Sequence, residues 1–176
     1  MPQPPIESLS LEAVMGMINS ALAEQRARVF VFFTEAHRKL SASIDQFKFA
    51  MSQADHCFAG DKQSGAMFVN QKYFLDSLAQ LTKTTNSKIA LLAGPEKASG
   101  PLARKLETTH QGFSGLIAID LAQNYHTDEA ITGQIIEAIN RASPDIVLVA
   151  SDLKNQEIWI ANYRHRFNCS VVIGLH

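Results

Sequence analysis

Residues 144–175, PDIVLVASDLKNQEIWIANYRHRFNCSVVIGL, contain the pattern that decides the fold class. The run from Ile146 to Ala150 is continuously apolar and rich in β-branched residues, as in a strand buried on both faces of a parallel sheet. A polar turn over 151–155, helical spacing around Trp159 and a second aliphatic run over 170–174 follow. This order predicts a strand, a crossover helix and a parallel strand, which is one βαβ unit.

The start of the helix in this unit is a candidate ligand site. Ligands of open α/β sheets bind beyond the carboxyl ends of the strands, which here means residues 151–157. Gln156 and Glu157 put an amide and a carboxylate there, where the positive end of the helix dipole favours an anion. Each also has a structural interpretation, Gln156 as a capping group and Glu157 as a carboxylate that stabilises the dipole.

The rest of the chain repeats the alternation of strands and helices. Strands are expected over 28–33, 54–59, 88–93 and 114–119, and helices over 11–26, 34–47, 64–81, 97–109 and 127–141. Ser10 and Thr127 are the expected N-caps of the first and fifth of these helices. We therefore expect one domain over residues 1–176, with residues 1–8 as a flexible or packed arm. Its fold class is α/β and Rossmann-like, with a mainly parallel sheet of about six strands and helices on both faces.

Composition excludes several classes of function. The net charge of −1 gives no electrostatic basis for nucleic-acid binding, and no apolar run approaches the ~18 residues of a membrane span. Cys57 and Cys169 lie in apolar segments and are expected to be buried free thiols, which fits a reducing cytoplasm. The six histidines are scattered and neither CxxC nor HxxxH occurs, so no metal site is expected. Four of them are interpreted as isolated structural or solvated residues: His37, His56, His110 and His165.

Residues 88–175 resemble the WecG/TagA/CpsF family of bacterial glycosyltransferases. The family pattern has an aliphatic strand ending in Gly, then Pro-Asp, a second aliphatic strand, Gln-Glu and a Trp-Ile helix. Here IALLAG over 89–94 fits the first strand, and Pro144 with Asp145 fits the Pro-Asp. QEIWIAN over 156–162 matches in ungapped register with Val149. Such a segment at this distance behind Pro-Asp is fairly specific.

The resemblance implies a function. Members of the family move an N-acetylhexosamine-type sugar from a UDP donor to a polyprenyl-diphosphate-linked acceptor, in polysaccharide or cell-wall polymer biosynthesis. The expected partners are thus a UDP-sugar and a lipid-diphosphate acceptor, with no cofactor and no nucleic acid. The expected location is the cytoplasm, at the inner face of the cytoplasmic membrane, with peripheral membrane contact.

The resemblance also implies a set of site residues. Asp61 is the candidate catalytic base if one residue is inserted, since Gly60 occupies the catalytic position in ungapped register. Its structural interpretation is an Asp in a Gly-containing turn. Tyr125 is expected either to stack on uracil or to pack on its neighbours, and Gly94 either approaches the diphosphate or simply ends a strand. The full set of expected donor-binding residues is Thr34, Gly94, Tyr125, Gln156 and Glu157.

The chain also departs from the family pattern. Phe32 and Thr34 occupy the positions of a Thr-x-Asn, and Lys154 with Asn155 replaces a Pro-Lys. Family members continue beyond the position of His176 with a segment that covers the active site, so exposed apolar surface there could lead to homo-oligomers. Three functions therefore stay open: an active glycosyltransferase, a catalytically degenerate homologue acting as a binding, regulatory or scaffolding module, or a generic nucleotide-binding domain.

Overall fold

A single parallel sheet forms the centre of the molecule in the computed structural model, which describes residues 5–176. The strand order is β2-β1-β6-β5-β3-β4, and all five neighbouring pairs are parallel. The strands are β1 (Arg28–Phe33), β2 (His56–Ala59), β3 (Ile89–Ala93), β4 (Ile117–Asp120), β5 (Ile146–Ala150) and β6 (Val171–Leu175). The expected Rossmann-like α/β class is confirmed.

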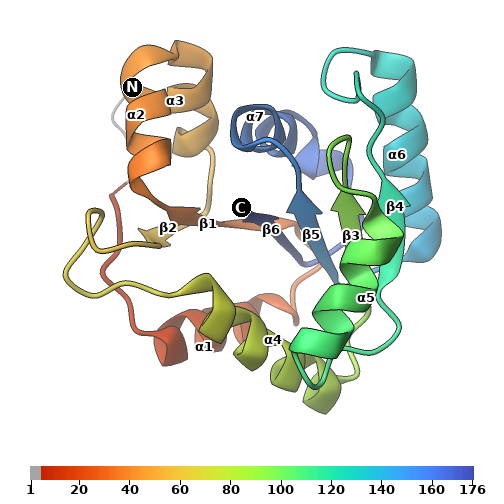
Figure 1. Cartoon of the computed structure of the whole chain (residues 1–176), viewed down its shortest axis with the longest axis horizontal. Coiled ribbons are helices and arrows are strands. Elements are labelled where there is room, and N and C mark those ends of the chain that lie inside the picture. Colours follow the sequence, from red (N-terminus) through yellow and green to blue (C-terminus); the bar gives the residue numbers. More distant parts are fainter. Residues whose placement is uncertain (1–4) are drawn as a thin grey trace.

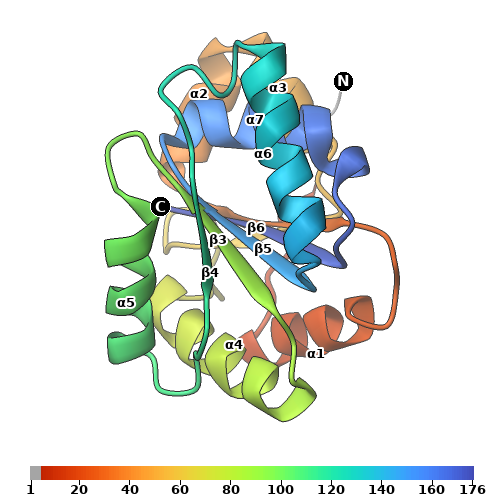
Figure 2. The same ribbon diagram turned by 90° about the vertical axis from the view of Figure 1, so that its right-hand side faces the viewer.

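Helices cover both faces of this sheet (Figures 1 and 2). One face carries α1 (Leu11–Ala21), α4 (Gln71–Thr85) and α5 (Ser99–Thr109). The other carries α2 (Glu35–Ser43), α3 (Asp45–Ser52), α6 (Glu129–Ala142) and α7 (Leu153–Tyr163), which is followed by the 3₁₀ turn η1 (Arg164–Arg166). No helix of residues 5–176 is both long enough and apolar enough to cross a lipid bilayer.

The strands divide their side chains between two cores. In β1, Val31 packs towards the cluster that contains Trp159, whereas Phe32 packs in the cluster with α1 and α4. This is the two-residue alternation of a strand that is buried on both sides. Cys57 and Cys169 are buried free thiols, as expected, and burial raises the pKa of each thiol to about 12.

Four expected helices differ from the structure. The stretch over 34–47 is two helices, because the backbone at Ile44 is extended between α2 and α3. The helix expected over 64–81 begins only at Gln71, after the N-cap Asn70. The N-cap expected at Thr127 is instead Asp128, whose side chain accepts from two backbone N–H groups of α6. The Ser10 cap is confirmed, although α1 ends at Ala21 and not near residue 26.

The N-terminal arm is packed where the structure describes it. The backbone of Glu7 accepts from Ala59 N–H at 3.1 Å and donates to the Cys57 carbonyl at 2.8 Å. Glu7 therefore pairs with the edge strand β2, as the packed alternative predicts. Residues 1–4, the rest of the expected arm, lie outside the described residues.

Several neighbouring strands continue at their carboxyl ends into helices on opposite faces, and two of these switch points concern the expected site. From the neighbours β3 and β5, the chain continues into α5 and α7, which lie on opposite faces. From the neighbours β1 and β2, it continues into α2 and α4, again on opposite faces. Strand β6 ends between these two switch points. Such points are where open α/β sheets bind ligands.

Candidate functional site

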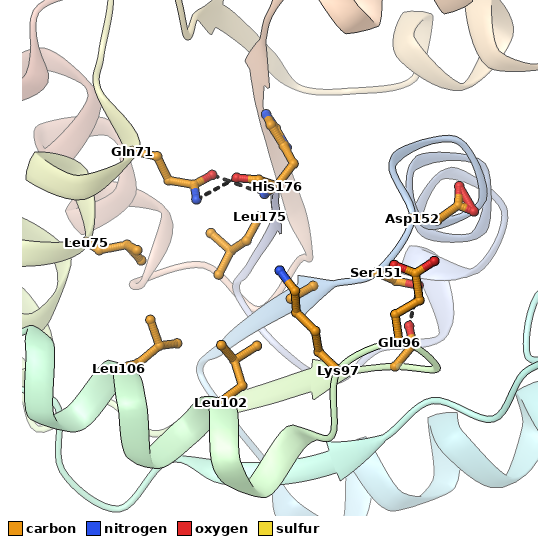
Figure 3. Close-up of a pocket in the computed structure, with 12 residues that line it drawn as sticks. Gln71, Leu75, Glu96, Lys97, Leu102, Leu106, Ser151, Asp152, Leu175 and His176 are labelled. Carbon is orange, nitrogen blue, oxygen red and sulfur yellow. Dashed lines mark hydrogen bonds between the residues drawn. The ribbon is translucent and has the colours of Figure 1, made fainter.

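A pocket of about 170 Å³ lies at the β3–β5 switch point. Figure 3 shows that its walls come from the ends of β3, β5 and β6 and from helices α4 and α5. Its apolar wall consists of Leu75, Leu102, Leu106, Ala150 and Leu175, and its polar wall of Gln71, Gly94, Glu96, Lys97, Ser151, Asp152 and His176. An apolar wall with a few convergent polar groups is the usual composition of a small-molecule site.

Gly94 shapes one edge of the pocket and can only be a glycine. Its φ is +139°, and a Cβ there would lie 2.4 Å from the Leu121 carbonyl oxygen. The hydroxyl of Ser151 donates to the Gly94 carbonyl at 2.5 Å, which joins the ends of β3 and β5. Of the residues expected to bind the donor, Gly94 is the one that lines this pocket.

Two other polar groups define the mouth of the pocket. The side-chain amide of Gln71 donates to the His176 carbonyl at 2.9 Å and accepts from its N–H at 3.2 Å, so it holds the backbone beyond β6. Lys97 is exposed, and its ammonium group extends into the pocket in Figure 3. This ammonium puts a positive charge beside the apolar wall.

Gln156 lies next to the pocket but is fully engaged by the protein. Its Oε1 accepts from Ser151 N–H at 2.9 Å, and its Nε2 donates to the Leu175 carbonyl and to Glu157 Oε1, both at 3.2 Å. The side chain is completely buried. It therefore fixes the ends of β5 and β6 relative to α7, which supports its structural interpretation and makes it a positioning residue.

Glu157 is buried as well, because β6 carries a glycine beside it. A Cβ at Gly174 would lie 2.3 Å from Glu157 Oε1 and 2.6 Å from Gln156 Nε2. The Glu157 side chain is 1% exposed, so it is not a simple surface carboxylate at a helix start. It faces away from the solvent, towards the side chain of His37.

Thr34 and Asp61 lie at the other switch point, outside the pocket. Thr34 is the N-cap of α2 and forms a capping box with His37. Asp61 accepts from the Glu35 N–H at 2.8 Å and from the Ser64 N–H at 2.9 Å. Burial alone would raise the pKa of Asp61, but these hydrogen bonds outweigh it and hold the pKa below the usual value. The carboxylate is thus ionised at neutral pH, although its proton affinity is low.

Tyr125 packs on its neighbours, which is the second of its two interpretations. The residue is 1% exposed, and its ring lies 5.5 Å from the Trp159 ring in an edge-to-face arrangement. Its hydroxyl donates to Ser151 Oγ at 3.2 Å, and burial raises its pKa to about 12. Trp159 is also a buried core residue, so neither ring is available to a nucleotide base in this structure.

The interpretation of His37 as isolated is wrong. Its ring centre lies 4.8 Å from that of His176, and its Nε2 lies 4.0 Å from Glu157 Oε1. His176 as a residue is exposed, but its ring packs against the rings of His37 and Phe32. Burial and the neighbouring His37 lower the pKa of His176 to about 4, so its ring is neutral at pH 7.

Two other histidines expected to be isolated also have partners. His56 Nδ1 lies 3.1 Å from a Glu7 carboxylate oxygen, and His110 Nδ1 lies 2.6 Å from an Asp76 oxygen. Both pairs lie outside the pocket and outside the cluster of His37 with Glu157 and His176. They fasten the N-terminal arm to β2 and the end of α5 to α4, so their structural interpretation holds.

Sequence reasoning missed several residues at these strand ends. Ser151 and Asp152 follow β5 within the segment expected to bind a ligand, but neither was singled out within it. Lys97 follows the Gly-Pro turn after β3, where a basic residue beyond a glycine could have been noticed. Gln71 and His176 carried no local signal, because their role depends on two segments far apart in the chain.

Two comparisons with known proteins connect this chain to a family of enzymes. A model of the glycosyl transferase WecG/TagA/CpsF family matches residues 3–175. An N-acetylglucosaminyldiphosphoundecaprenol N-acetyl-β-D-mannosaminyltransferase from Bacillus spizizenii is 31% identical over 74 residues. That alignment covers 42% of this chain and 28% of the relative, so it spans less than a third of the relative's length.

Proposed function

This chain belongs to the WecG/TagA/CpsF family of glycosyltransferases, and on that premise we propose that it moves an N-acetylhexosamine-type sugar from a UDP donor to a polyprenyl-diphosphate-linked acceptor. The reaction would serve polysaccharide or cell-wall polymer biosynthesis and use no cofactor. The observation that carries the proposal is the pocket at the β3–β5 switch point, with Gly94 at its edge and Lys97 within it.

The pocket suits part of a nucleotide sugar. Its volume of about 170 Å³ is below the ~300 Å³ at which sites for drug-sized ligands begin, so a whole donor would extend over the open edge. The leucines of α4 and α5 offer an apolar surface for a base or sugar ring, and the Lys97 ammonium group offers a counter-charge for the diphosphate. The polyprenyl tail of the acceptor stays in the bilayer, so the proposal includes peripheral contact at the cytoplasmic face.

Asp61 is the proposed base. Transfer requires that the acceptor hydroxyl lose its proton as its oxygen bonds to the anomeric carbon, while the bond from that carbon to UDP breaks. An ionised carboxylate has about four lone-pair positions, and two of those of Asp61 are used by the N–H groups of Glu35 and Ser64. The hydrogen bonds that lower its pKa make it a base that accepts the proton late in the reaction.

The first test is a thermal-unfolding titration with UDP, UDP-N-acetylglucosamine and UDP-N-acetylmannosamine, with AMP as the control nucleotide. A ligand at about 100 times its Kd stabilises the folded state by about 2.7 kcal/mol, which gives a clear rise in Tm. We expect a saturable rise with the uridine ligands and none with AMP. An equal response to AMP would instead favour a generic nucleotide-binding domain.

Two lysine variants, one inside the pocket and one outside it, test whether UDP binds in this pocket. Lys97→Ala should weaken UDP binding about tenfold, because a hydrogen bond to a charged group contributes about 1.5–3 kcal/mol. Lys105→Ala removes an exposed lysine of α5 that does not line the pocket, and it should leave the affinity for UDP unchanged. Equal effects of the two substitutions would contradict binding in this pocket.

One observation favours the alternative of a non-catalytic member. Thr34 and Asp61 both act as caps at the start of α2, so their positions are explained without any chemistry. That alternative predicts no transfer of labelled sugar from a UDP donor to a lipid-diphosphate analogue, whatever the response to UDP. Detectable product in this assay would remove it.

A further inference from the structure

Three side chains from distant parts of the chain meet where β6 ends between the two switch points. His37 belongs to the first turn of α2, Glu157 to the second turn of α7, and His176 directly follows β6. One potential ligand atom from each of the three lies within 4.8 Å of the others. Figure 3 shows the His176 ring pointing away from the leucines of the pocket, so the cluster adjoins the pocket through His176 and lies on the side away from its apolar wall.

One atom of the cluster lacks a partner. Nε2 of His37 is buried and has no hydrogen-bond partner among the described residues. The nearest oxygen of Glu157 is 4.0 Å away, which is beyond hydrogen-bond distance, and the two side chains are 0% and 1% exposed. A buried polar atom without a hydrogen-bond partner destabilises the folded state. His37 Nε2 and the Glu157 carboxylate therefore offer two polar atoms, with no hydrogen bond between them, to a further group.

Two of the three side chains are also held from behind, and the backbone of the third residue, His176, is held by Gln71. Glu157 Oε1 accepts from Gln156 Nε2 at 3.2 Å, and the Nδ1 of His37 lies 2.9 Å from Thr34 Oγ1. Outer partners of this kind, polar side chains behind the ligands, orient histidines and carboxylates in metal sites.

We propose that His37, Glu157 and His176 bind a divalent first-row transition-metal ion, with Zn²⁺ as the representative ion. Two imidazole nitrogens and one carboxylate oxygen are a ligand set that zinc accepts, and a fourth position is left for water or another ligand. One Zn²⁺ would balance the buried carboxylate and give His37 Nε2 the partner that it lacks. The site does not depend on the proposed sugar transfer, and metal binding can be measured without nucleotide.

Binding requires a small closure and a tautomer change. Two ligands about 2.1 Å from a tetrahedral zinc lie ~3.4 Å apart, whereas the present atoms lie within 4.8 Å, so they have to approach by up to about 1.4 Å. In the capping box, Thr34 N–H donates to His37 Nδ1, which puts the ring proton on Nε2. On metal binding this proton moves to Nδ1, which then donates to Thr34 Oγ1, and Nε2 becomes a ligand. The capping bond from Thr34 N–H to Nδ1 is given up in exchange. The neutral ring releases no proton.

The experiment is calorimetric titration of tag-free protein, first stripped with EDTA and then dialysed, with ZnCl₂. Co²⁺ is titrated in parallel, because its visible absorption reports the geometry of the ligands. His176→Gln is the main variant, since this residue lies outside every strand and helix and its loss should leave the fold intact. Glu157→Gln is the second variant. His165→Gln is the control, because His165 is an exposed histidine of η1 outside the cluster.

We expect one Zn²⁺ per chain, a tetrahedral Co²⁺ spectrum and the same affinity in His165→Gln as in the unmodified protein. His176→Gln and Glu157→Gln should each weaken binding by about tenfold or more, which is the size of effect seen when even outer partners of a zinc site are lost. Circular dichroism checks that both variants are folded. Absence of saturable binding at a several-fold molar excess of Zn²⁺, or unchanged affinity in a folded His176→Gln variant, would overturn the proposal.

Discussion

Gly174 is the point at which β6 passes the N-terminal half of α7, with the Gln156 and Glu157 side chains directly against its Cα. We expect Gly174→Ala to lower the free energy of unfolding by about 1–3 kcal/mol, because the new methyl group would have to displace both buried side chains. Urea unfolding measures this difference. Gly133→Ala in α6 is the control, since a Cβ there meets nothing within 4 Å. That substitution should stabilise the protein by about 0.5–1 kcal/mol.

The role of Asp61 can be separated from its structural contribution with a second aspartate. Asp120 also caps a helix from a strand end, since its Oδ1 accepts from the Ser99 N–H at 2.9 Å and from the Ser99 hydroxyl at 2.8 Å. Asp61→Asn and Asp120→Asn should lower the free energy of unfolding by similar amounts, about 1–2 kcal/mol. If Asp61 is the base, only its substitution lowers kcat, by about 10²–10⁴. Equal kcat values in the two variants would exclude Asp61 as the base.

For single residues, the sequence predicts which segment lies at the site more readily than which atoms contact a ligand. Gln156 and Glu157 do lie at the carboxyl end of a strand, as their position after the 146–150 run predicts. Whether they contact a ligand or the protein depends on Gly174 and Leu175, which are brought to them by tertiary packing. The pairing of His37 with His176 has the same cause. No local spacing connects two histidines that meet only when α2 and β6 are assembled.

Elements are predicted best where burial dominates and worst where polar backbone contacts compete. All the runs of β-branched and aliphatic residues are strands, although β2 and β4 are shorter than expected. The apolar spacing over 64–70 indicated a helix, but Val69 N–H donates to the Ala59 carbonyl at 2.8 Å. That segment thus runs beside β2, and its Met67 is 51% exposed, which does not fit the buried face of a helix. Periodicity alone does not reveal such a contact.

Asn70, the N-cap of α4, is expected to support the mouth of the pocket through Gln71. Asn70 Oδ1 accepts from Lys72 N–H at 2.9 Å, and the helix that it caps carries Gln71, which holds the His176 backbone. We expect Asn70→Ala to cost about 1 kcal/mol, whereas Asn70→Asp should cost little, because aspartate is an equally good N-cap. Hydrogen exchange provides the second measurement. The His176 amide should exchange faster in Asn70→Ala, and unchanged exchange would mean that the cap does not support the pocket mouth.

The whole molecule is held across its layers by Asp55, which precedes β2. Its carboxylate accepts from Val29 N–H of β1 at 2.9 Å, from Arg26 at 2.9 Å and from Arg164 beyond α7. This joins the edge of the sheet to the helical layer on one face. The strand order could not be predicted from the chain order, because β6 inserts between β1 and β5 and so brings segments from both chain ends together. The long-range pairs of Asp55 are a consequence of that topology.

The contacts of the Asp55 carboxylate predict how the free energy of unfolding depends on pH in acid. Burial alone would raise the pKa of Asp55, but the Val29 N–H and the two guanidinium groups outweigh it and hold the folded-state pKa below 3.8. The unfolded chain, with a pKa near ~3.9, therefore takes up this proton more readily than the folded one. The stabilisation is complete above about pH 5 and is lost as the pH falls through the lower, folded-state pKa.

Asp55→Asn isolates this contribution. At pH 7 the variant should be less stable by about 2 kcal/mol, because two arginines lose their charged partner and Asp55 is 10% exposed. The difference should shrink steadily below about pH 4, where the aspartate itself becomes protonated. Glu137→Gln is the control, since Glu137 is 73% exposed in an i,i+4 pair and such pairs contribute about 0.3–0.5 kcal/mol. A difference that stays constant from pH 7 to pH 3 would mean that Asp55 acts through its shape and not its charge, and the link between the edge of the sheet and α7 would then be steric.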